Sequence, residues 1–251
     1  MTLGTDHARA MRRFPRTGLC GRLQVTVIAG ALGLTAIAVA AAAAAAPPFA
    51  ARDLARQFFG PTFARAEIVS VSGKTRDYRI DEGKVVALRA GALDLLERDG
   101  TRQTIRIGAA TQVTGFGPRA IGIAATLRGR VVVLREGDGP ATLVRPSSTM
   151  RTLGKVFLGA SLARAEIIAF DGAVHDYRID EGRIVALRAG GLVLAERDGS
   201  RQTVKLASTT LVTTLSTPVD QSFLTRGIVV LTIREGDEAA TEVRILSGVR
   251  R

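Results

Sequence analysis

Two stretches of the chain are copies of one another, and this internal repeat constrains the fold more than any other feature. Residues 64–107 align with residues 163–206 without a gap, and 28 of the 44 aligned positions are identical. The heptapeptide DYRIDEG occurs once in each copy, at Asp77–Gly83 and Asp176–Gly182, and contains both tyrosines of the chain. A solenoid needs at least three stacked repeats to bury a core. Two copies therefore predict two tandem small domains.

Each copy has the hydrophobic pattern of β-strands. In the first copy AEIVSV and DYRI alternate on either side of Gly73, KVVALR follows as a further strand, and LDLLER and RQTIRI flank Asp99-Gly100. Alternation with period two is typical of half-buried strands, and an Asp-Gly between such runs predicts a hairpin with a type I′ turn. VVVLRE and ATLVR flank Gly137-Asp138-Gly139 as a closing pair. Short strands with regular turn signals predict a small barrel or sandwich.

A short amphipathic helix is predicted before each copy. ARDLARQFF places Leu54 and Phe58 four positions apart, and TMRTLGKVF does the same with Leu153 and Phe157. Residues at this spacing share one face of a helix. Pro61 limits the first helix to an end near the preceding residue.

The segments RIDEGKVVALRAGALDLLERDGTRQTIRIGAATQVT and LRGRVVVLREGDGPATLVR resemble the OB-like small β-barrel domain of unknown function found in exported proteins of high-GC bacteria. The shared features are a glycine inside the first strand, two hairpins closed by Asp-Gly and a Thr-x-Val-Thr strand. The resemblance covers residues 78–146 and 177–246. It implies two tandem OB-like antiparallel barrels and no catalytic residue. The chain departs from the pattern at Gly115–Gly129, which is glycine-rich in the first copy only.

The N-terminus has the pattern of an export segment. Five arginines precede Leu23–Ala46, a run of 24 residues without a charge. A helix of this length spans roughly 36 Å, enough to cross the hydrocarbon core of a bilayer. The positive flank favours a cytoplasmic N-terminus, with residues 47–251 outside the membrane.

Two outcomes are open for this apolar segment. The alanine run Ala40–Ala46 favours a signal peptide that is cleaved, and the chain is then secreted. The long basic region and Pro47-Pro48 favour a retained membrane anchor, which we prefer. Met11 is an alternative start to Met1. Cys20 is the only cysteine, which excludes an intrachain disulfide, and its position before the apolar run does not fit a lipoprotein.

The chain is strongly basic, with a formal net charge of +12 and 35 Lys and Arg residues, of which only four are lysine. Residues 1–51 hold five of the basic and one of the 23 acidic residues, so the exported part keeps 30 basic and 22 acidic residues. Scattered arginines and few lysines are typical of a high-GC genome, but guanidinium groups also suit phosphate and carboxylate. The candidate polyanion contacts are Arg76, Arg79, Arg102, Arg106, Arg178 and Arg201.

The sequence predicts no catalytic, cofactor or metal site. SGKT at Ser72–Thr75 resembles the end of a phosphate-binding loop, but Ile68 occupies the position of the required glycine. The two histidines are His7 and His175, and His175 aligns with Arg76 in the first copy. This pattern does not fit a zinc site or a histidine-dependent nucleophile.

Paired carboxylates recur in both copies and are the best remaining case for chemistry. Such pairs serve glycosidase-type catalysis in some proteins and bind calcium in others. Because each pair adjoins an arginine at a predicted turn, we interpret them as turn residues on a solvated face. They are Asp81-Glu82, Glu97/Asp99, Glu136/Asp138, Asp180-Glu181, Glu196/Asp198 and Glu235/Asp237.

The repeated tyrosines, Tyr78 and Tyr177, are predicted to be structural. Each alternates with an arginine along its strand, so we expect the ring to close the barrel interior and the hydroxyl to lie at the rim. The alternative is a platform on which bases or sugars stack. Such platforms combine several aromatic side chains, and here there is one per copy.

These observations predict a mainly β, non-enzymatic protein of the cell envelope that serves interaction or scaffolding. Its expected partners are the membrane, through residues 23–46, and an envelope protein or anionic polymer; no small-molecule cofactor is expected. Binding of an anionic envelope polymer or nucleic acid through arginine-rich strand faces is the alternative, and a carboxylate-dependent envelope hydrolase is a weaker one. The predicted segments are a basic cytoplasmic region (1–22), an apolar helix (23–46), a linker with a short helix (47–63), barrel repeat 1 (64–146), a second linker with a short helix (147–162) and barrel repeat 2 (163–248).

Overall fold

The computed structural model describes residues 48–116, 129–214 and 217–247. Within these residues the chain is mainly β, as predicted, and its few helices are short. No helix in this part of the chain is long and apolar enough to span a bilayer. The predicted apolar helix over residues 23–46 lies outside the described residues.

The two repeats share one α-helix and six strands in the same order, and the described part of repeat 2 has three further short elements. Repeat 1 consists of α1 (Pro48–Phe58), β1 (Phe63–Ser72), β2 (Lys74–Arg89), β3 (Ala92–Glu97), β4 (Arg102–Val113), β5 (Arg130–Glu136) and β6 (Ala141–Pro146). Repeat 2 consists of η1 (Ser147–Thr149), α3 (Met150–Phe157), β7 (Leu162–Phe170), β8 (Val174–Arg188), β9 (Gly191–Glu196), β10 (Arg201–Thr214), β11 (Thr217–Val219), η2 (Gln221–Phe223), β12 (Val229–Glu235) and β13 (Ala240–Ser247). The separate strands predicted for DYRI and KVVALR form one continuous strand, β2.

Five strands of each repeat pair in an order that returns to its first strand. In repeat 1 the order is β2–β3–β4–β6–β5–β2, and in repeat 2 it is β8–β9–β10–β13–β12–β8. All these pairings are antiparallel except β4–β6 and β10–β13, which are parallel. We term these sets the ring of repeat 1 and the ring of repeat 2. Each has its own buried aliphatic cluster, with Leu95 in the first and Leu194 in the second.

The hairpin predicted at Asp99-Gly100 is present, but its turn differs from the predicted type I′. The N–H of Gly100 donates to the Glu97 carbonyl, and the N–H of Glu97 donates to the Thr101 carbonyl. Gly100 itself is left-handed, with φ of 84°. This pattern is a type I turn followed by a left-handed glycine, which is the usual form of a slightly longer hairpin loop.

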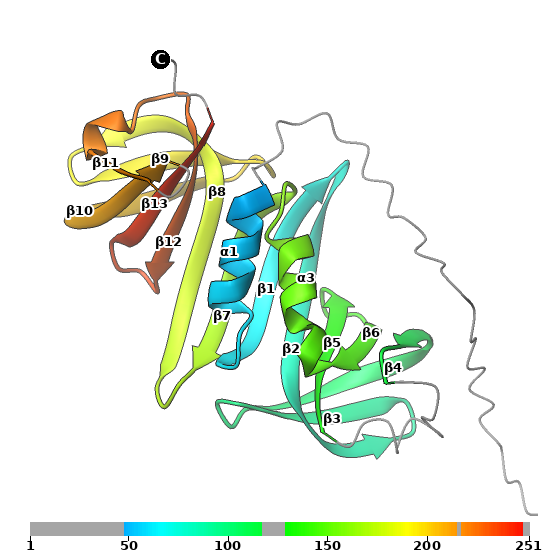
Figure 1. The fold of residues 1–251 in the computed structure, drawn as a ribbon. Helices are drawn as coiled ribbons and strands as arrows, with labels where there is room; N and C mark the ends of the chain where they lie inside the picture. The colour runs from blue at the N-terminus through cyan, green and yellow to red at the C-terminus, as the bar shows by residue number, and fades with distance from the viewer. Residues whose placement is uncertain (1–47, 117–128, 215–216, 248–251) are drawn as a thin grey trace, which may run out of the picture. The chain divides into compact units, whose positions relative to one another are not determined.

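A central sheet of four strands, β2–β1–β7–β8, joins the two repeats (Figure 1). β1 and β7 pair antiparallel, and Glu67 of repeat 1 lies opposite Glu166 of repeat 2. These two residues occupy equivalent positions of the repeat, and the neighbouring pairs again exchange equivalent positions. The repeats are therefore related by a local two-fold axis between Glu67 and Glu166, as in an isologous interface.

One hydrophobic cluster covers the central sheet and contains side chains of both repeats. Its fully buried members include Ile68 and Ile167 from the strands and Phe59 from the end of α1. Helices α1 and α3 lie side by side (Figure 1), so closely that a β-carbon on Gly154 would come within 2.7 Å of the Phe59 ring. The three buried clusters together bury side chains of α1, α3 and the strands of both repeats against one another. We therefore expect residues 47–251 to fold without the N-terminal segment.

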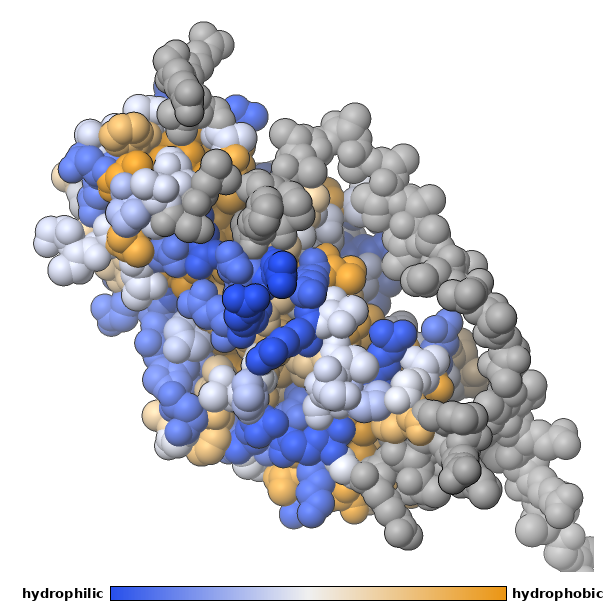
Figure 2. All heavy atoms as spheres, viewed as in Figure 1, coloured by the Kyte–Doolittle hydropathy of each residue, from blue (hydrophilic) through white to orange (hydrophobic). Residues whose placement is uncertain are grey.

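Both helices lie where the sequence predicts them and bury the predicted faces. Leu54, Phe58, Leu153 and Phe157 are all buried in the shared cluster. Hydrophilic residues cover the outer face of α1 (Figure 2). The exposed residues of that face are Arg52, Asp53, Arg56 and Gln57.

The two repeated tyrosines belong to the shared cluster rather than to the interior of the rings. The Tyr78 ring packs against Phe157 of α3 with centroids 4.9 Å apart, and Tyr177 packs against Phe58 of α1 at 5.1 Å. Each tyrosine thus contacts the helix of the other repeat. The predicted barrel-closing position is wrong. Each tyrosine lies at the edge of its ring, opposite Glu136 of β5 or Glu235 of β12, and its side chain packs against the shared cluster.

Candidate functional site: basic faces and buried acidic clusters

Three of the six predicted polyanion contacts are paired with carboxylates of the protein itself. Arg79 forms ion pairs with Glu67 and Asp138 at 3.1 and 2.8 Å. Arg178, at the equivalent position of repeat 2, and Arg76 are also paired with carboxylates. These three arginines lie on the central sheet, and their positive charges are neutralised by these carboxylates. They are poor candidates for binding a polymer.

The other three predicted contacts lie on the rings and face solvent. Arg102 and Arg106 are on β4 and Arg201 is on β10, and all three are exposed. Side chains alternate along a strand, and the intervening Ile105 is buried in the ring. Within the described part of the chain, neither Arg102 nor Arg201 forms an ion pair. These arginines are available to a ligand.

The register places two further cations of repeat 1 beside Arg102 and Arg106. Lys84 and Arg102 flank the same residue of β3 in one row, and Arg89 and Arg106 flank another in a second row. The spacing between strands puts the two cations of a row about 10 Å apart, and the rise along β4 separates the rows by about 13 Å. Four positive charges therefore surround β3 on the outer surface of the ring.

Repeat 2 has the same arrangement around β9. Arg183 and Arg201 form one row, and Arg188 and Lys205 form the other. All eight side chains are exposed. We term these sets the basic face of repeat 1 (Lys84, Arg89, Arg102, Arg106) and the basic face of repeat 2 (Arg183, Arg188, Arg201, Lys205).

The positive charge of these faces is kept even where the residue type changes. Lys84 corresponds to Arg183 in the other repeat, and Arg106 corresponds to Lys205. Two of the four lysines of the chain thus lie on the basic faces. A bias toward arginine codons explains many arginines, but it does not explain a cation that is kept as lysine. The two repeats therefore keep a positive charge at these positions, whichever residue supplies it.

Contacts within the protein orient some of these cations without neutralising them. Arg106 donates to the backbone carbonyl of Asp138 at 2.9 Å, and Lys205 donates to that of Asp237 at 3.0 Å. A carbonyl carries no net charge, so both cations keep their attraction for an anion.

The basic face of repeat 1 contains a carboxylate that its counterpart lacks. Asp94 pairs with Arg89 at 3.0 Å and accepts a hydrogen bond from Thr104. Val193 occupies the equivalent position in repeat 2. The basic face of repeat 2 is therefore the more positive of the two.

Five members of the basic faces were not predicted as candidate contacts. A signal was present in the sequence, because each aligns with a basic residue in the other repeat. The strands to which they belong were assigned, but their outward positions follow from the register. The five are Lys84, Arg89, Arg183, Arg188 and Lys205.

Half of the twelve repeated carboxylates are buried, and the prediction that they form solvated turns is wrong for these six. Glu136, Asp138, Glu235 and Asp237 do lie at exposed turns. The buried ones are Asp81, Glu82, Glu97, Asp180, Glu181 and Glu196.

Asp81 and Glu82 lie in the middle of β2, where the chain does not turn. Gly83 follows them because the neighbouring strand comes very close. A β-carbon at this position would lie 2.8 Å from the backbone oxygen of Leu96. The glycine therefore serves close strand packing rather than a turn.

Arginines hold the buried carboxylates in place. Arg130 donates to Glu82 at 2.7 Å, and Arg98 lies 3.2 Å from the same carboxylate. Arg65 pairs with Glu97 at 2.6 Å. Ion pairs of this kind compensate charges that would be costly to bury alone.

Burial raises the pKa of Glu97 to about 7, despite the attraction of Arg65. A raised pKa is what a general acid needs, but such a group must also reach its substrate. The Glu97 side chain has no exposed surface. Burial also raises the pKa of Asp81, Asp180, Glu181 and Glu196. The raised pKa of these acids fits a catalytic acid of a hydrolase, but their buried positions do not allow contact with a substrate.

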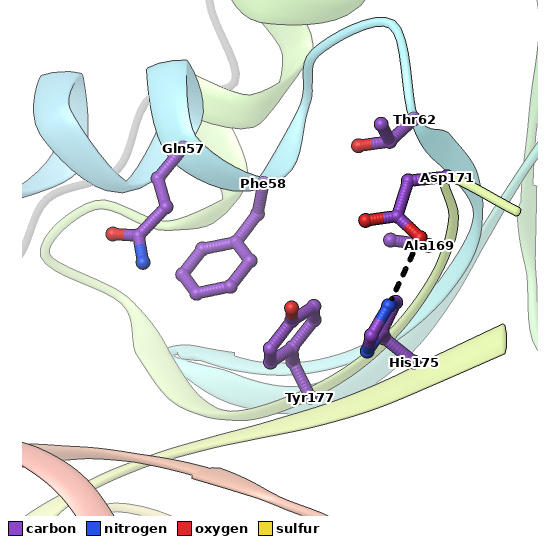
Figure 3. A pocket seen from close by; sticks show the side chains of 7 residues that line it. All are labelled: Gln57, Phe58, Thr62, Ala169, Asp171, His175 and Tyr177. Atoms are coloured by element: carbon purple, nitrogen blue, oxygen red, sulfur yellow. Dashed lines mark hydrogen bonds and ion pairs between the residues drawn. The ribbon is translucent and has the colours of Figure 1, made fainter. Parts of the chain in front are cut away.

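His175 lines a small hollow of about 90 Å³ beside α1 (Figure 3). Its ring nitrogens contact Glu235 at 2.8 Å and Asp171 at 3.1 Å, and the hydrogen bonds to these two carboxylates raise the pKa of the imidazole. The hollow is much smaller than a typical ligand pocket of about 300 Å³ or more. In repeat 1, Arg76 takes this position and pairs with Glu136. We interpret His175 as a structural partner of Glu235 and Asp171.

Within the described residues, no group of three or more His, Cys, Asp or Glu side chains is arranged to hold a metal ion. No protein family matches the chain, and no curated protein or solved structure shows significant similarity to it. The basic faces are therefore the feature from which we infer function.

Proposed function

We propose that this chain is a non-enzymatic protein of the cell envelope that binds an anionic polymer through its two basic faces. In this proposal residues 23–46 hold the chain at the membrane, and residues 47–251 lie outside. The observation that carries the proposal is the charge kept at four exposed positions in both repeats, two of which exchange lysine and arginine.

We also infer that each ring is an OB-like barrel, as the sequence resemblance implies. The support is the order of five strands that returns to its first strand, with one parallel pairing. OB-folds bind oligonucleotides and oligosaccharides on the face of their second and third strands. In this chain those strands are β3 and β4 in repeat 1 and β9 and β10 in repeat 2. The basic faces include exposed residues of this region.

Contact with an envelope protein is the second candidate function. Leu88 and Leu187 occupy equivalent positions near the hairpin ends of β2 and β8, and both are exposed, by 38% and 49%. The observation that favours this candidate is that an aliphatic side chain is exposed at the same place in both repeats.

The main proposal is tested by binding of residues 47–251 to two polyanion probes, single-stranded DNA and polyphosphate, across a salt series. In the double variant Arg102→Gln/Arg201→Gln, we expect weaker binding to both probes. For single-stranded DNA, each lost phosphate contact is expected to reduce the slope of log K against log salt by about 0.7.

The matched control is the double variant Arg52→Gln/Arg151→Gln. These residues also occupy equivalent positions, are exposed and lie on α1 and α3, away from the rings. The control removes the same net charge and is expected to leave the salt slope unchanged. Equal losses in the two double variants would show that only net charge matters and would reject the basic faces as sites.

A further inference from the structure

A groove of about 580 Å³ lies at one end of the ring of repeat 2. Three segments form it: the hairpin between β8 and β9, the middle of β10, and the stretch around η2. Its lining includes Leu187, Arg188, Leu206, Ser208, Gln221 and Leu224. The volume lies in the range of about 300–1,000 Å³ that small-molecule sites occupy.

The floor of the groove is apolar and continuous with the core of the ring. Leu224 is 4% exposed and belongs to the buried cluster of repeat 2, and Leu206 packs against the same cluster. At the rim, Leu187 leaves about half of its surface exposed. An aliphatic group placed here would cover apolar surface that now faces water.

Hydrogen bonds fix the wall of the groove around η2. The Gln221 amide donates to the carbonyls of Ala207 and Thr210, at 2.7 and 3.3 Å. The Asp220 carboxylate accepts from the N–H of Ser222 at 2.8 Å and caps the turn. The wall is therefore attached to β10 and is preformed for a ligand.

The charge of the groove favours an anion. Among the described residues that line it, Arg188 is the one charged side chain and none is a carboxylate. Arg188 belongs to the basic face of repeat 2, in the same row as Lys205. The groove thus combines an aliphatic floor with a cationic rim.

We propose that this groove binds an amphiphilic anion, a phosphate monoester that carries a short alkyl chain. The alkyl chain lies against Leu187, Leu206 and Leu224, and the phosphate pairs with Arg188. The groove shares Arg188 with the basic face of repeat 2, but the two proposals can fail separately, because a polyanion needs the charges of the basic faces and not the apolar floor.

The test is calorimetric titration of residues 47–251 with octyl phosphate below its critical micelle concentration. Inorganic phosphate and octyl glucoside are the probes for the headgroup alone and the chain alone. We expect saturable binding of one octyl phosphate per chain, at least tenfold tighter than either control probe. Equal affinity for octyl phosphate and inorganic phosphate would overturn the proposal, as would the absence of saturation.

Two variants locate the site. Arg188→Gln removes the cation, and Ser208→Trp fills the groove from an exposed position; each is expected to weaken octyl phosphate binding at least tenfold. The matched control is Arg89→Gln, at the equivalent position of repeat 1, which is expected to leave the affinity unchanged. Equal weakening by Arg89→Gln and Arg188→Gln, or unchanged binding in Ser208→Trp, would place the ligand elsewhere.

The outcome for this groove is separable from that for the polymer. If Arg102→Gln/Arg201→Gln abolishes polyanion binding but leaves octyl phosphate binding intact, this supports a groove site that does not depend on Arg102 or Arg201. Polyanion binding without any octyl phosphate binding rejects the groove alone.

Discussion

Repeat 1 and repeat 2 share one strand register but neutralise their buried acids differently. Glu82 of repeat 1 pairs with two arginines, one of which is Arg130. In the described part of repeat 2, Glu181 pairs with Arg197 alone, because Val229 replaces Arg130. The buried carboxylate is kept while its set of partners changes. One good arginine partner is therefore sufficient to retain it.

The exposed charges behave in the opposite way. Every position of the basic faces stays cationic in both repeats, although no buried group requires it. Elsewhere on the exposed surface the repeats diverge, for example at Lys74, which becomes Ala173, and at Asp53, which becomes Thr152. The fold therefore requires the buried ion pairs, whereas the exposed cations of the basic faces are the charges that we propose to bind a ligand.

The largest effect is expected where the two repeats share a core. Ile68→Ala and Ile167→Ala each remove a fully buried side chain from the shared cluster. Each is expected to lower the free energy of unfolding by about 2–5 kcal/mol. Urea unfolding of residues 47–251 should show one cooperative transition in both variants, with similar losses. Two separate transitions would contradict the shared core.

The difference between the two buried glutamates predicts unequal effects of their arginines. Arg197→Ala is expected to cost about 3 kcal/mol, because it leaves Glu181 without an ion-pair partner. Arg98→Ala is expected to cost about 1 kcal/mol, because Arg130 still holds Glu82. Urea denaturation at neutral pH measures both.

Arg130→Val converts repeat 1 to the state of repeat 2 and serves as the control for this difference. Added to Arg98→Ala, it should raise the loss to that of Arg197→Ala. If Arg98→Ala alone already costs as much as Arg197→Ala, the number of partners is irrelevant and the comparison fails.

The raised pKa of Glu97 predicts a loss of stability as pH rises. Its pKa is about 7 in the folded chain against 4.5 in the reference state, so between these values the unfolded chain releases the proton first. The stability loss develops from about pH 4.5 to pH 7 and then stays constant. Glu97→Gln removes this dependence and should gain about 1–3 kcal/mol over that interval.

Glu196→Gln is the matched variant in repeat 2. The Ser200 hydroxyl donates to Glu196 at 2.7 Å and favours its ionised form, although burial still raises the pKa of Glu196. One oxygen of Glu97, in contrast, has no hydrogen-bond partner in the described residues. The pH dependence removed by Glu196→Gln should therefore be smaller; a larger one would contradict the role of Ser200. Urea unfolding between pH 4.5 and 8 measures both variants.

The smallest effect is expected at His175. Its folded pKa is raised by Glu235 and Asp171, so its contribution to stability is fully present below about pH 6.5 and is lost as pH rises through the folded value. His175→Arg should remove this dependence, and Arg76→His should introduce one in repeat 1. Thermal midpoints between pH 5 and 9 measure both. An unchanged profile in His175→Arg would assign the dependence to another group.

The sequence by itself was sufficient for the local features of this protein. Alternating side chains located the strands, and the spacing of Leu54 and Phe58 located α1 and its buried face. Asp99-Gly100 marked a hairpin, although the turn type depended on the hydrogen bonds of Glu97. These features follow from periodicity and backbone geometry within a few residues, and they can therefore be predicted from the sequence.

The tertiary structure decided which of these residues are buried and which repeat they contact. The sequence predicts a turn at Asp81 and Glu82, because acidic residues before a glycine are common in turns. Only the close approach of β3 shows that both residues are buried inside a strand. Tyr78 meets a helix from the other repeat, a contact between residues far apart in sequence. The positions of Lys84 and Arg102 on one face depend on the register of β2, β3 and β4. Burial, ion pairing and shared faces arise from such long-range pairing, whereas strand and helix formation is mostly a local property of the chain.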